Sequence, residues 1–517
     1  SAGCRCRRGS RPGRPCSSWA RRPCYDCCAR ARDLREQVMA RILLLQILME
    51  AEIEAIKDAS LAILRETGVM VHHEGMLRLL GEAGATVDAG RKVARLPEKL
   101  VMDSVDRAGK QYVLYGRDTN RTARFGYGDL VLMSSPGQYA WIDLQTGQRR
   151  PATMQDAHDA IRLGDALDSI TIVGAMAQPE TVSEKYRDVV LTGELVKATG
   201  KPTRCWVRNG ATARYILEIY RTLAGGDAAL RARPMVEAFL EPISPLQLPR
   251  DGLDIVKEFA QAGQPVSIGP MAMTAGTAPG TLAGTLAQEN AEILAGIVIT
   301  QLLVPGTPIT YGGIPHIMDP RTGICSFGSP EQGLMAVAMV QIARSYGFPV
   351  YINVGLTDAK LPDAQAGMEK AATLLLGVLA GADTFGHCGI CGTDHAGSLL
   401  WLAFDDELMS YLKRIARGFT VDPERLATDV IHAAGPAGNF LAEEHTVRHF
   451  REELWLPNPI WTRQSYDLWH SGGATSCVDR LRERVTNILA THQPPSLDET
   501  LSREIDRIVA SAQRELE

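Results

Sequence analysis

The chain has 517 residues, of which 45% are hydrophobic and 22% charged, a length and composition typical of a soluble protein with a large core. No run of about 18 apolar residues occurs, which argues against a membrane-spanning helix. Residues 1–35 hold ten of the 55 basic residues and two of the 60 acidic ones, so the rest of the chain has 45 basic and 58 acidic groups, a net charge of −13. We therefore expect the folded body not to bind nucleic acid.

The first 35 residues differ from the remainder in composition. Six of the eleven cysteines lie within the first 28 residues, and no apolar stretch of the kind found in secretory signals is present there. We expect residues 1–35 to be a disordered or non-native extension outside the natural start, with a zinc-binding knot or a basic tail as the alternatives. The other five cysteines are scattered, which favours a cytoplasmic protein with reduced thiols.

The remaining chain divides into three parts. Residues 36–125 predict an N-terminal helical cap, with a first helix between residues 36 and 70. Residues 126–419 alternate between apolar runs and amphipathic stretches. Residues 420–517 predict a C-terminal helical extension, with one helix starting at Asp422-Pro423-Glu424 and two more covering 478–491 and 497–516.

The alternation in the middle part contains eight units. The apolar runs occur at 130–134, 169–176, 203–207, 235–240, 265–270, 308–312, 349–355 and 383–387. The helical stretches occur near 154–166, 183–199, 210–224, 250–262, 285–304, 330–346, 363–380 and 398–416. Alternation of this kind predicts parallel strands joined by helical crossovers, and eight units predict an α/β fold of the closed (β/α)₈ type, a TIM barrel.

Active sites of such barrels lie at the C-terminal ends of the strands, and several chemically capable side chains follow the predicted strands. The carboxylates Glu237, Glu241 and Asp358 could supply counter-charge or transfer protons, or could equally form buried ion pairs or helix caps. Aromatic rings there could hold a quaternary ammonium by cation–π attraction, or could pack in the core. These aromatic candidates are Tyr139, Trp206, Phe239, Tyr311 and Phe327, and the histidines His316 and His387 join them as candidate substrate contacts.

The segment after the eighth strand also contains potential metal ligands. His387, Cys388, Cys391 and His395 lie within nine residues. Structural zinc sites usually join two ligand pairs across a longer loop, whereas this segment places all four in one short turn rich in glycine. We therefore favour a pocket lined by reduced thiols and no metal, with zinc binding and a redox-active dithiol as the alternatives.

The stretch at 351–367 is the most informative. An apolar strand ends at Gly355, Leu356 follows, and a polar loop with Asp358 leads to a helix that opens at Pro362-Asp363, where Asp363 is expected to cap it. Together with residues 143–153, 278–284, 288–292, 361–370, 404–407, 435–441 and 445–446, this stretch resembles the trimethylamine methyltransferase family. The resemblance covers about residues 40–515.

The resemblance implies both a fold and an activity. Members of the family form (β/α)₈ barrels and move a methyl group from a methylated amine to the cobalt of a separate corrinoid protein, which would dock on the open face of the barrel. The founding enzymes place pyrrolysine after the glycine that ends the seventh strand. In this chain that position holds Leu356, which cannot form a covalent adduct with an amine.

Relatives without pyrrolysine resemble demethylases of quaternary amines such as glycine betaine. The resemblance therefore implies a quaternary amine, with a betaine favoured, as the substrate, because its leaving group is already a neutral tertiary amine. It also implies a cognate corrinoid protein as partner, with no cofactor held tightly by this chain, and we expect a homo-oligomer. Leu356, Glu237 and Asp358 are then the candidates for the catalytic position and its charged neighbours.

Two other functions stay open at this point. One is a metal- or thiol-dependent barrel enzyme that uses the cluster of His387, Cys388, Cys391 and His395. The other is a non-catalytic betaine-binding protein, against which the single-barrel organisation counts.

Overall fold

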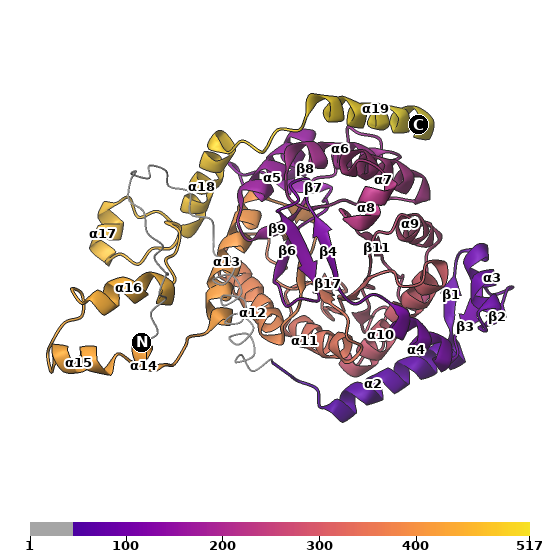
Figure 1. Ribbon diagram of the computed structural model, residues 1–517, viewed down its shortest axis with the longest axis horizontal. Coiled ribbons are helices and arrows are strands. Elements are labelled where there is room, and N and C mark those ends of the chain that lie inside the picture. The colour runs from indigo at the N-terminus through magenta and orange to yellow at the C-terminus, as the bar shows by residue number, and fades with distance from the viewer. Residues whose placement is uncertain (1–44) are drawn as a thin grey trace, which may run out of the picture.

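The computed structural model describes residues 45–517, and a ring of eight parallel strands lies at its centre (Figure 1). The strands are β6 (Val131–Ser134), β9 (Ile170–Gly174), β10 (Thr203–Arg204), β11 (Ala238–Leu240), β13 (Val266–Ile268), β15 (Ile309–Gly313), β18 (Val350–Ile352) and β19 (Thr384–Cys388). The last strand pairs with the first, with Thr384 opposite Val131, so the sheet curves round on itself. No ladder joins β10 to β11 in the described part of the chain, which leaves one seam. The predicted TIM barrel is confirmed.

Helices surround the strands on all sides in Figure 1. The crossover helices are α5 (Met154–Ala166), α6 (Arg187–Ala198), α7 (Gly210–Ala224), α9 (Arg250–Gln261), α10 (Leu282–Leu303), α11 (Pro330–Ser345), α12 (Ala364–Ala380) and α13 (Leu399–Arg417), with the short α8 (Asp227–Ala232) after α7. Side-chain caps mark the start of several of these helices: at α12, Asp363 accepts from the backbone nitrogens of Gln365 and Ala366, as predicted. Gly381 ends α12 in the left-handed conformation that a side chain would disfavour.

The N-terminal cap contains strands as well as helices. Helix α2 (Glu50–Ala62), a π-helical turn η1 (Ile63–Thr67), α3 (Glu74–Glu82) and α4 (Glu98–Arg107) accompany the strands β1 (Val69–Val71), β2 (Thr86–Asp88) and β3 (Val93–Arg95). These strands join β12 (Gln247–Leu248) in a four-stranded sheet, and α2 and α4 contact α10. The predicted first helix is confirmed over 50–62, and its residues 36–44, like the extension at 1–35, lie outside the described residues.

A hairpin that the periodicity did not predict closes the floor of the barrel. Its strands are β4 (Tyr112–Tyr115) and β5 (Thr122–Phe125), and the rings of Tyr112 and Phe125 stack with their centroids 4.4 Å apart. They pack against Val131, Met133 and Ile172, the inward-facing residues of the first two barrel strands. The hairpin shields the N-terminal end of the barrel, so the opposite end is left for substrate entry.

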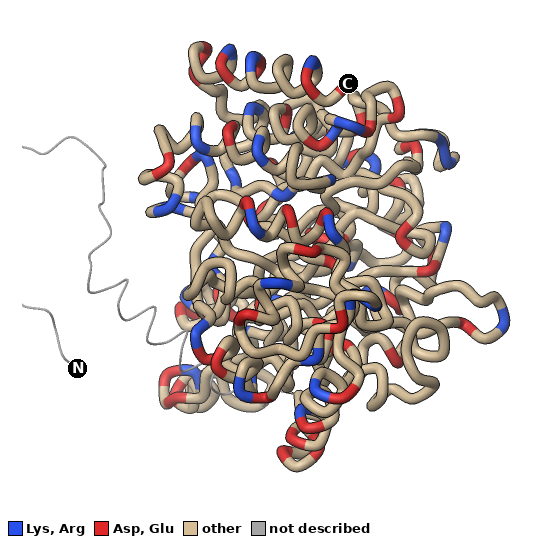
Figure 2. The backbone as a smooth tube through the Cα atoms, turned by 90° about the vertical axis from the view of Figure 1, so that its right-hand side faces the viewer, with Lys and Arg blue, Asp and Glu red and all other residues tan. Residues whose placement is uncertain are grey.

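The C-terminal part is helical. The short helices α14 (Pro423–Leu426), α15 (Thr428–Ala434), α16 (Glu444–Glu453) and α17 (Tyr466–Ser471) project from the barrel on the left of Figure 1 and contain no buried residue. Helices α18 (Cys477–Thr491) and α19 (Glu499–Leu516) return to the barrel. Acidic and basic positions are interspersed on the side that Figure 2 shows. Between residues 45 and 517, no helix is long and apolar enough to cross a membrane.

Candidate active site

The barrel interior is lined by alternate residues of the strands, because successive side chains of a strand point to opposite faces. Phe239 and Tyr351 meet there edge to face, with ring centroids 6.0 Å apart. Glycines make room for both rings: a methyl group on Gly386 would overlap the Tyr351 hydroxyl, and one on Gly269 would lie 3.1 Å from the Phe239 ring. The predicted aromatic Phe239 therefore lies in the lumen, beside a tyrosine that the sequence interpretation did not select.

An ion pair spans the seam between β10 and β11. Arg204 donates from Nη1 to Glu237 Oε1 at 2.7 Å, and the Tyr112 hydroxyl donates to Glu237 Oε2 at 2.8 Å. Burial raises the pKa of Glu237, and the charge of Arg204 opposes that shift. Both carboxylate oxygens of Glu237 thus have partners near the floor. Of the two roles considered for Glu237, the structure favours the buried ion pair with Arg204 over direct contact with a substrate.

Several buried polar atoms of the lumen lack a hydrogen-bond partner among the described residues. They are Ser267 Oγ, Tyr351 Oη, Asn353 Oδ1 and Nδ2, Thr384 Oγ1 and His387 Nδ1. An unmade hydrogen bond of this kind costs about 1–3 kcal/mol, so buried groups in folded proteins are nearly always paired. A concentration of such groups inside one barrel indicates a place where a polar ligand or ordered water belongs.

His387 reaches this place because of a β-bulge. The register of β19 against β6 shifts between Phe385 and Cys388, and His387 adopts a φ of 65°, which turns its ring toward Tyr351 at a centroid distance of 6.3 Å. Burial lowers the pKa of His387 to about 3, and the Arg204 charge acts in the same direction. The imidazole is therefore neutral at physiological pH.

His316 is completely buried just beyond the end of β15, which lies two strands from β19 in the sheet, and its imidazole is also neutral. It lies in β16 (His316–Met318), and burial lowers its pKa to about 4. The Gln332 amide of α11 donates both to His316 Nε2 at 3.0 Å and to the Asn353 carbonyl at 2.7 Å, so one side chain orients the histidine and the end of β18. The Phe327 ring lies 4.5 Å from the His316 ring, between centroids.

Leu356 belongs to a small apolar cluster beyond the end of β18. It is 1% exposed and packs with Phe327 and Ile390, and Met271 and Cys325 complete the cluster. The position before it, Gly355, has a φ of 82°, which suits only glycine well. The Gly355 carbonyl accepts a hydrogen bond from the buried Lys370 ammonium at 2.8 Å. Leu356 is thus held rigidly by its neighbours.

Asp358 anchors a loop. Its carboxylate accepts from Ser326 Oγ at 2.5 Å and from the Phe327 backbone nitrogen at 2.9 Å. Ser326 ends β17 (Cys325–Ser326), which pairs with β16, so Asp358 fixes the hairpin that carries Phe327 over Leu356. This geometry favours positioning the apolar cluster over proton transfer.

The other predicted contacts divide between rim and helix layer. Tyr139 is 60% exposed and Trp206 is 38% exposed, both on loops at the C-terminal ends of strands. Tyr311 instead faces outward from β15, where its hydroxyl donates to Asn290 of α10 at 2.9 Å, so the structure does not bring it to the lumen.

Two carboxylates near the mouth have raised pKa values. Burial raises the pKa of Glu241, which has no hydrogen-bond or ion-pair partner among the described residues. Burial and the nearby charge of Glu241 raise the pKa of Asp394 to about 7, although Gln138 donates to it at 2.7 Å. Thr393 and Asp394 have φ values of 65° and 61°, a strained conformation of the kind that collects at functional sites. The sequence interpretation had not selected Asp394.

The cysteine and histidine cluster does not form one site. Cys388 packs in the main core and Cys391 packs with Trp401, whereas His387 faces the lumen and His395 is exposed. Burial raises the pKa of Cys391 to about 11 and holds the pKa of Cys388 well above its usual value, so neither thiol is activated. No group of three or more His, Cys, Asp or Glu side chains converges in the described range 45–517. The four side chains therefore do not converge on one point, and the two cysteines pack in different clusters, which argues against both the zinc and the dithiol alternative.

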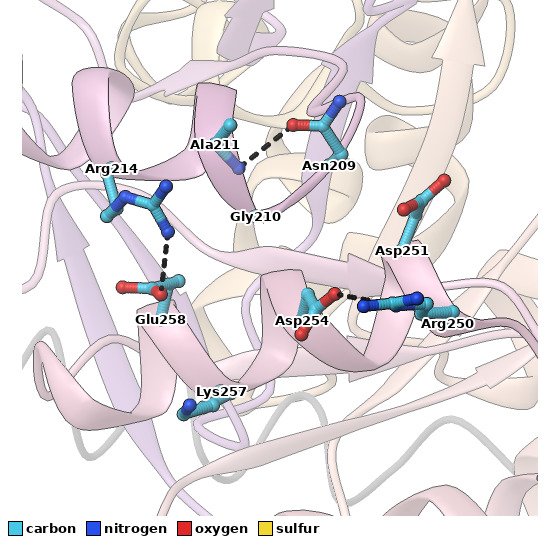
Figure 3. Close-up of a pocket in the computed structure, with 9 residues that line it drawn as sticks. All are labelled: Asn209, Gly210, Ala211, Arg214, Arg250, Asp251, Asp254, Lys257 and Glu258. Atoms are coloured by element: carbon cyan, nitrogen blue, oxygen red, sulfur yellow. Dashed lines mark hydrogen bonds and ion pairs between the residues drawn. The ribbon is translucent and has the colours of Figure 1, made fainter. Parts of the chain in front are cut away.

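A groove of about 470 Å³ lies outside the barrel, between the first turns of α7 and α9 (Figure 3). Its charged residues largely pair with each other, as Arg214 does with Glu258 at 3.3 Å and Arg250 with Asp254 at 3.8 Å. It contains none of the predicted site residues. The lumen remains the candidate active site.

Known proteins resemble this chain over most of its length. The family described as trimethylamine methyltransferase (MTTB) matches residues 25–517. The chain belongs to the trimethylamine methyltransferase family. It is 30% identical to the trimethylamine methyltransferase MttB of Desulfitobacterium hafniense strain DCB-2, covering 94% of this chain and 98% of that protein. It is 31% identical to the glycine betaine methyltransferase of D. hafniense strain Y51, covering 91% and 98%. This chain is accordingly a methyltransferase.

Solved structures support the fold. The monomethylamine methyltransferase MtmB of Methanosarcina barkeri aligns with 94% of this methyltransferase and 91% of its own chain, at a TM-score of 0.50 and 11% identity. At that identity the likeness concerns the fold alone.

Proposed function

We propose that this methyltransferase takes a methyl group from a quaternary amine, a betaine in particular, and passes it to the cobalt of a separate corrinoid protein. The observation that carries the proposal is the position of Leu356, an alkyl side chain packed among Phe327 and Ile390 at the end of β18. An alkyl group there can shape a pocket and exclude water, but it cannot activate an amine by bonding to it. A substrate with a quaternary nitrogen needs no such activation.

The charges near the mouth of the lumen favour a cation. Glu241 and Asp394 supply negative charge near the mouth, and a cation between them would relieve their mutual repulsion. The rings of Phe239 and Tyr351 are already engaged by Arg204, whose guanidinium carbon lies 4.9 and 5.5 Å from their centroids. These rings consequently hold the arginine in place, and the ammonium is left to the carboxylates and the apolar cluster.

The rim suits a protein partner. Large apolar side chains are exposed on the loops that follow five strands and on the first turns of α12, namely Tyr139, Trp206, Ile243, Ile324, Leu361 and Met368. Exposed apolar side chains gathered at one end of a fold can form a protein-binding surface. The corrinoid carried by that partner supplies a cobalt(I) nucleophile that accepts the methyl group. This chain would position the methyl group and keep water away from it.

The experiment is to mix the purified protein with reduced cobalamin and one amine at a time, and to follow methylcobalamin by absorbance. We expect transfer from glycine betaine or a related quaternary amine and none from trimethylamine. Transfer from trimethylamine, or from no quaternary amine at all, would contradict the proposal.

A further inference from the structure

The guanidinium of Arg204 makes hydrogen bonds from only one of its three nitrogens. Of its nitrogens only Nη1 hydrogen-bonds to described residues, to Glu237 Oε1 and more weakly to the Met133 Sδ atom at 3.4 Å. The Nε and Nη2 atoms have no hydrogen-bond partner among the described residues, so this edge of the fork is left for a ligand. A planar guanidinium with a free edge binds a carboxylate through two parallel hydrogen bonds.

Two further donors lie in the same part of the lumen as Arg204. The Tyr351 hydroxyl is buried and unpaired, and its ring lies 5.5 Å from the Arg204 guanidinium carbon. His387 Nδ1 is also buried and unpaired, on a ring 6.3 Å from that of Tyr351. A neutral imidazole can donate from this nitrogen. A cation, a phenol and a neutral imidazole in one part of the lumen are groups that can bind an anion.

The opposite end of the lumen differs in charge. Along β11 the lumen-facing positions are Glu237, Phe239 and Glu241, and the rise of a strand separates the first from the last by about 13 Å. Glu241 therefore lies well above the Arg204 ion pair, on the side of the mouth, with Asp394 near it. At depth the lumen thus holds a neutral ion pair with an unused guanidinium edge, and toward the mouth it holds the carboxylates Glu241 and Asp394.

From this arrangement we propose that the lumen binds a zwitterionic quaternary amine lengthwise. The carboxylate lies on the free edge of Arg204 and accepts from Tyr351 Oη and His387 Nδ1. The ammonium and its methyl groups lie toward Glu241 and Asp394. The inference rests on the proposed function and adds to it the residues that read the substrate's anionic end, so that betaines are selected over cations without a carboxylate.

The test measures binding by calorimetry, without cobalamin, for glycine betaine and for tetramethylammonium, which has the same cation and no carboxylate. We expect the wild-type protein to bind betaine at least tenfold more tightly. Tyr351→Phe removes only the unpaired hydroxyl, so it should weaken betaine binding about tenfold or more and leave tetramethylammonium unchanged. Glu241→Gln should weaken both ligands. The control is Tyr220→Phe, because the Tyr220 hydroxyl bonds to Thr203 in the helix layer.

The inference is overturned if Tyr351→Phe binds betaine as wild type does, if it loses both ligands equally, or if wild type binds tetramethylammonium as tightly as betaine. Absence of betaine binding at millimolar concentration also overturns it. Failure of methyl transfer to cobalamin is a separate outcome: it removes the proposed function, whereas loss of betaine selectivity with intact transfer removes only the carboxylate site.

Discussion

Lys370 donates from Nζ to both carboxylate oxygens of Asp405, at 2.8 and 3.1 Å, and the two side chains are 0% and 4% exposed. The same ammonium donates to the Gly355 carbonyl, and Asp405 accepts from the Gly389 nitrogen at 2.8 Å. One buried ion pair therefore joins the end of β18, which carries Leu356, to the turn after β19, which follows His387.

We expect Lys370→Met to lower the free energy of unfolding by about 3–5 kcal/mol, because it leaves Asp405 charged and unpaired in the interior. The double variant Lys370→Met with Asp405→Leu should recover a large part of that loss. Urea denaturation measures both. Lys99→Met, which breaks an exposed pair with Asp103, is the matched control and should cost less than about 1 kcal/mol. Equal losses of unfolding free energy for Lys370→Met and Lys99→Met would show that the buried pair stabilises the fold no more than an exposed pair does.

Leu356→Ala should reduce kcat/KM for the quaternary amine about five- to hundredfold, through the loss of roughly 1–3 kcal/mol of apolar contact with the substrate. Leu356→Lys should be worse, because a cation beside a cation repels. The exposed Leu334→Ala of α11 is the control, and circular dichroism checks the fold. If both Leu356 variants fold and transfer methyl groups at the wild-type rate, the site lies elsewhere.

Tyr311→Phe separates a structural role from a substrate role. Its hydroxyl bonds to Asn290 behind the barrel wall, so the variant should lose about 1 kcal/mol of stability and keep the wild-type affinity for betaine. Thermal denaturation and calorimetry on the same sample provide the comparison. A tenfold drop in betaine affinity at unchanged stability would return Tyr311 to the list of substrate contacts.

The buried histidines should make stability depend on pH in a defined direction. His316 and His387 have folded pKa values of about 4 and 3, below the usual value of 6.5, so the unfolded chain binds more protons between those limits. Each histidine therefore causes a loss of stability as pH falls below 6.5, by up to about 1.4 kcal/mol per pH unit.

Because raised carboxylate pKa values such as that of Asp394 act in the opposite sense, the informative quantity is the difference between variants. His316→Gln and His387→Asn should each flatten the fall in unfolding free energy between pH 6.5 and 5. His432→Gln, at an exposed position of α15, should leave it unchanged. An unaltered slope in both buried variants would mean that these histidines are not held neutral.

The barrel could be predicted because its signal is local. All eight apolar runs became strands, and helices such as α5 and α7 begin and end at the predicted residues, since capping side chains and periodicity lie within each segment. The floor hairpin at 112–125 was missed because its role depends on contacts with strands far along the chain.

The site was predictable only as a region. Topology places the residues that follow the strands at the mouth of the barrel. Arg204 became a candidate through its ion pair across the seam, and Tyr351 through the glycines that make room in the lumen. Asp394 became a candidate through its strained turn. Tyr351 and Asn353 do follow the alternation of β18, and that period of two was a usable signal for inward-facing polar groups. The sequence held no signal that Tyr311 faces the helices and not the lumen.

The most direct test of methyl transfer uses glycine betaine labelled with carbon-13 in its N-methyl groups. The protein is incubated with this substrate and reduced cobalamin, and both products are quantified by mass spectrometry. We expect labelled methylcobalamin and dimethylglycine in a ratio of one to one, with both reduced together in Leu356→Ala. Consumption of betaine without methylcobalamin, or no consumption of any quaternary amine, would contradict it.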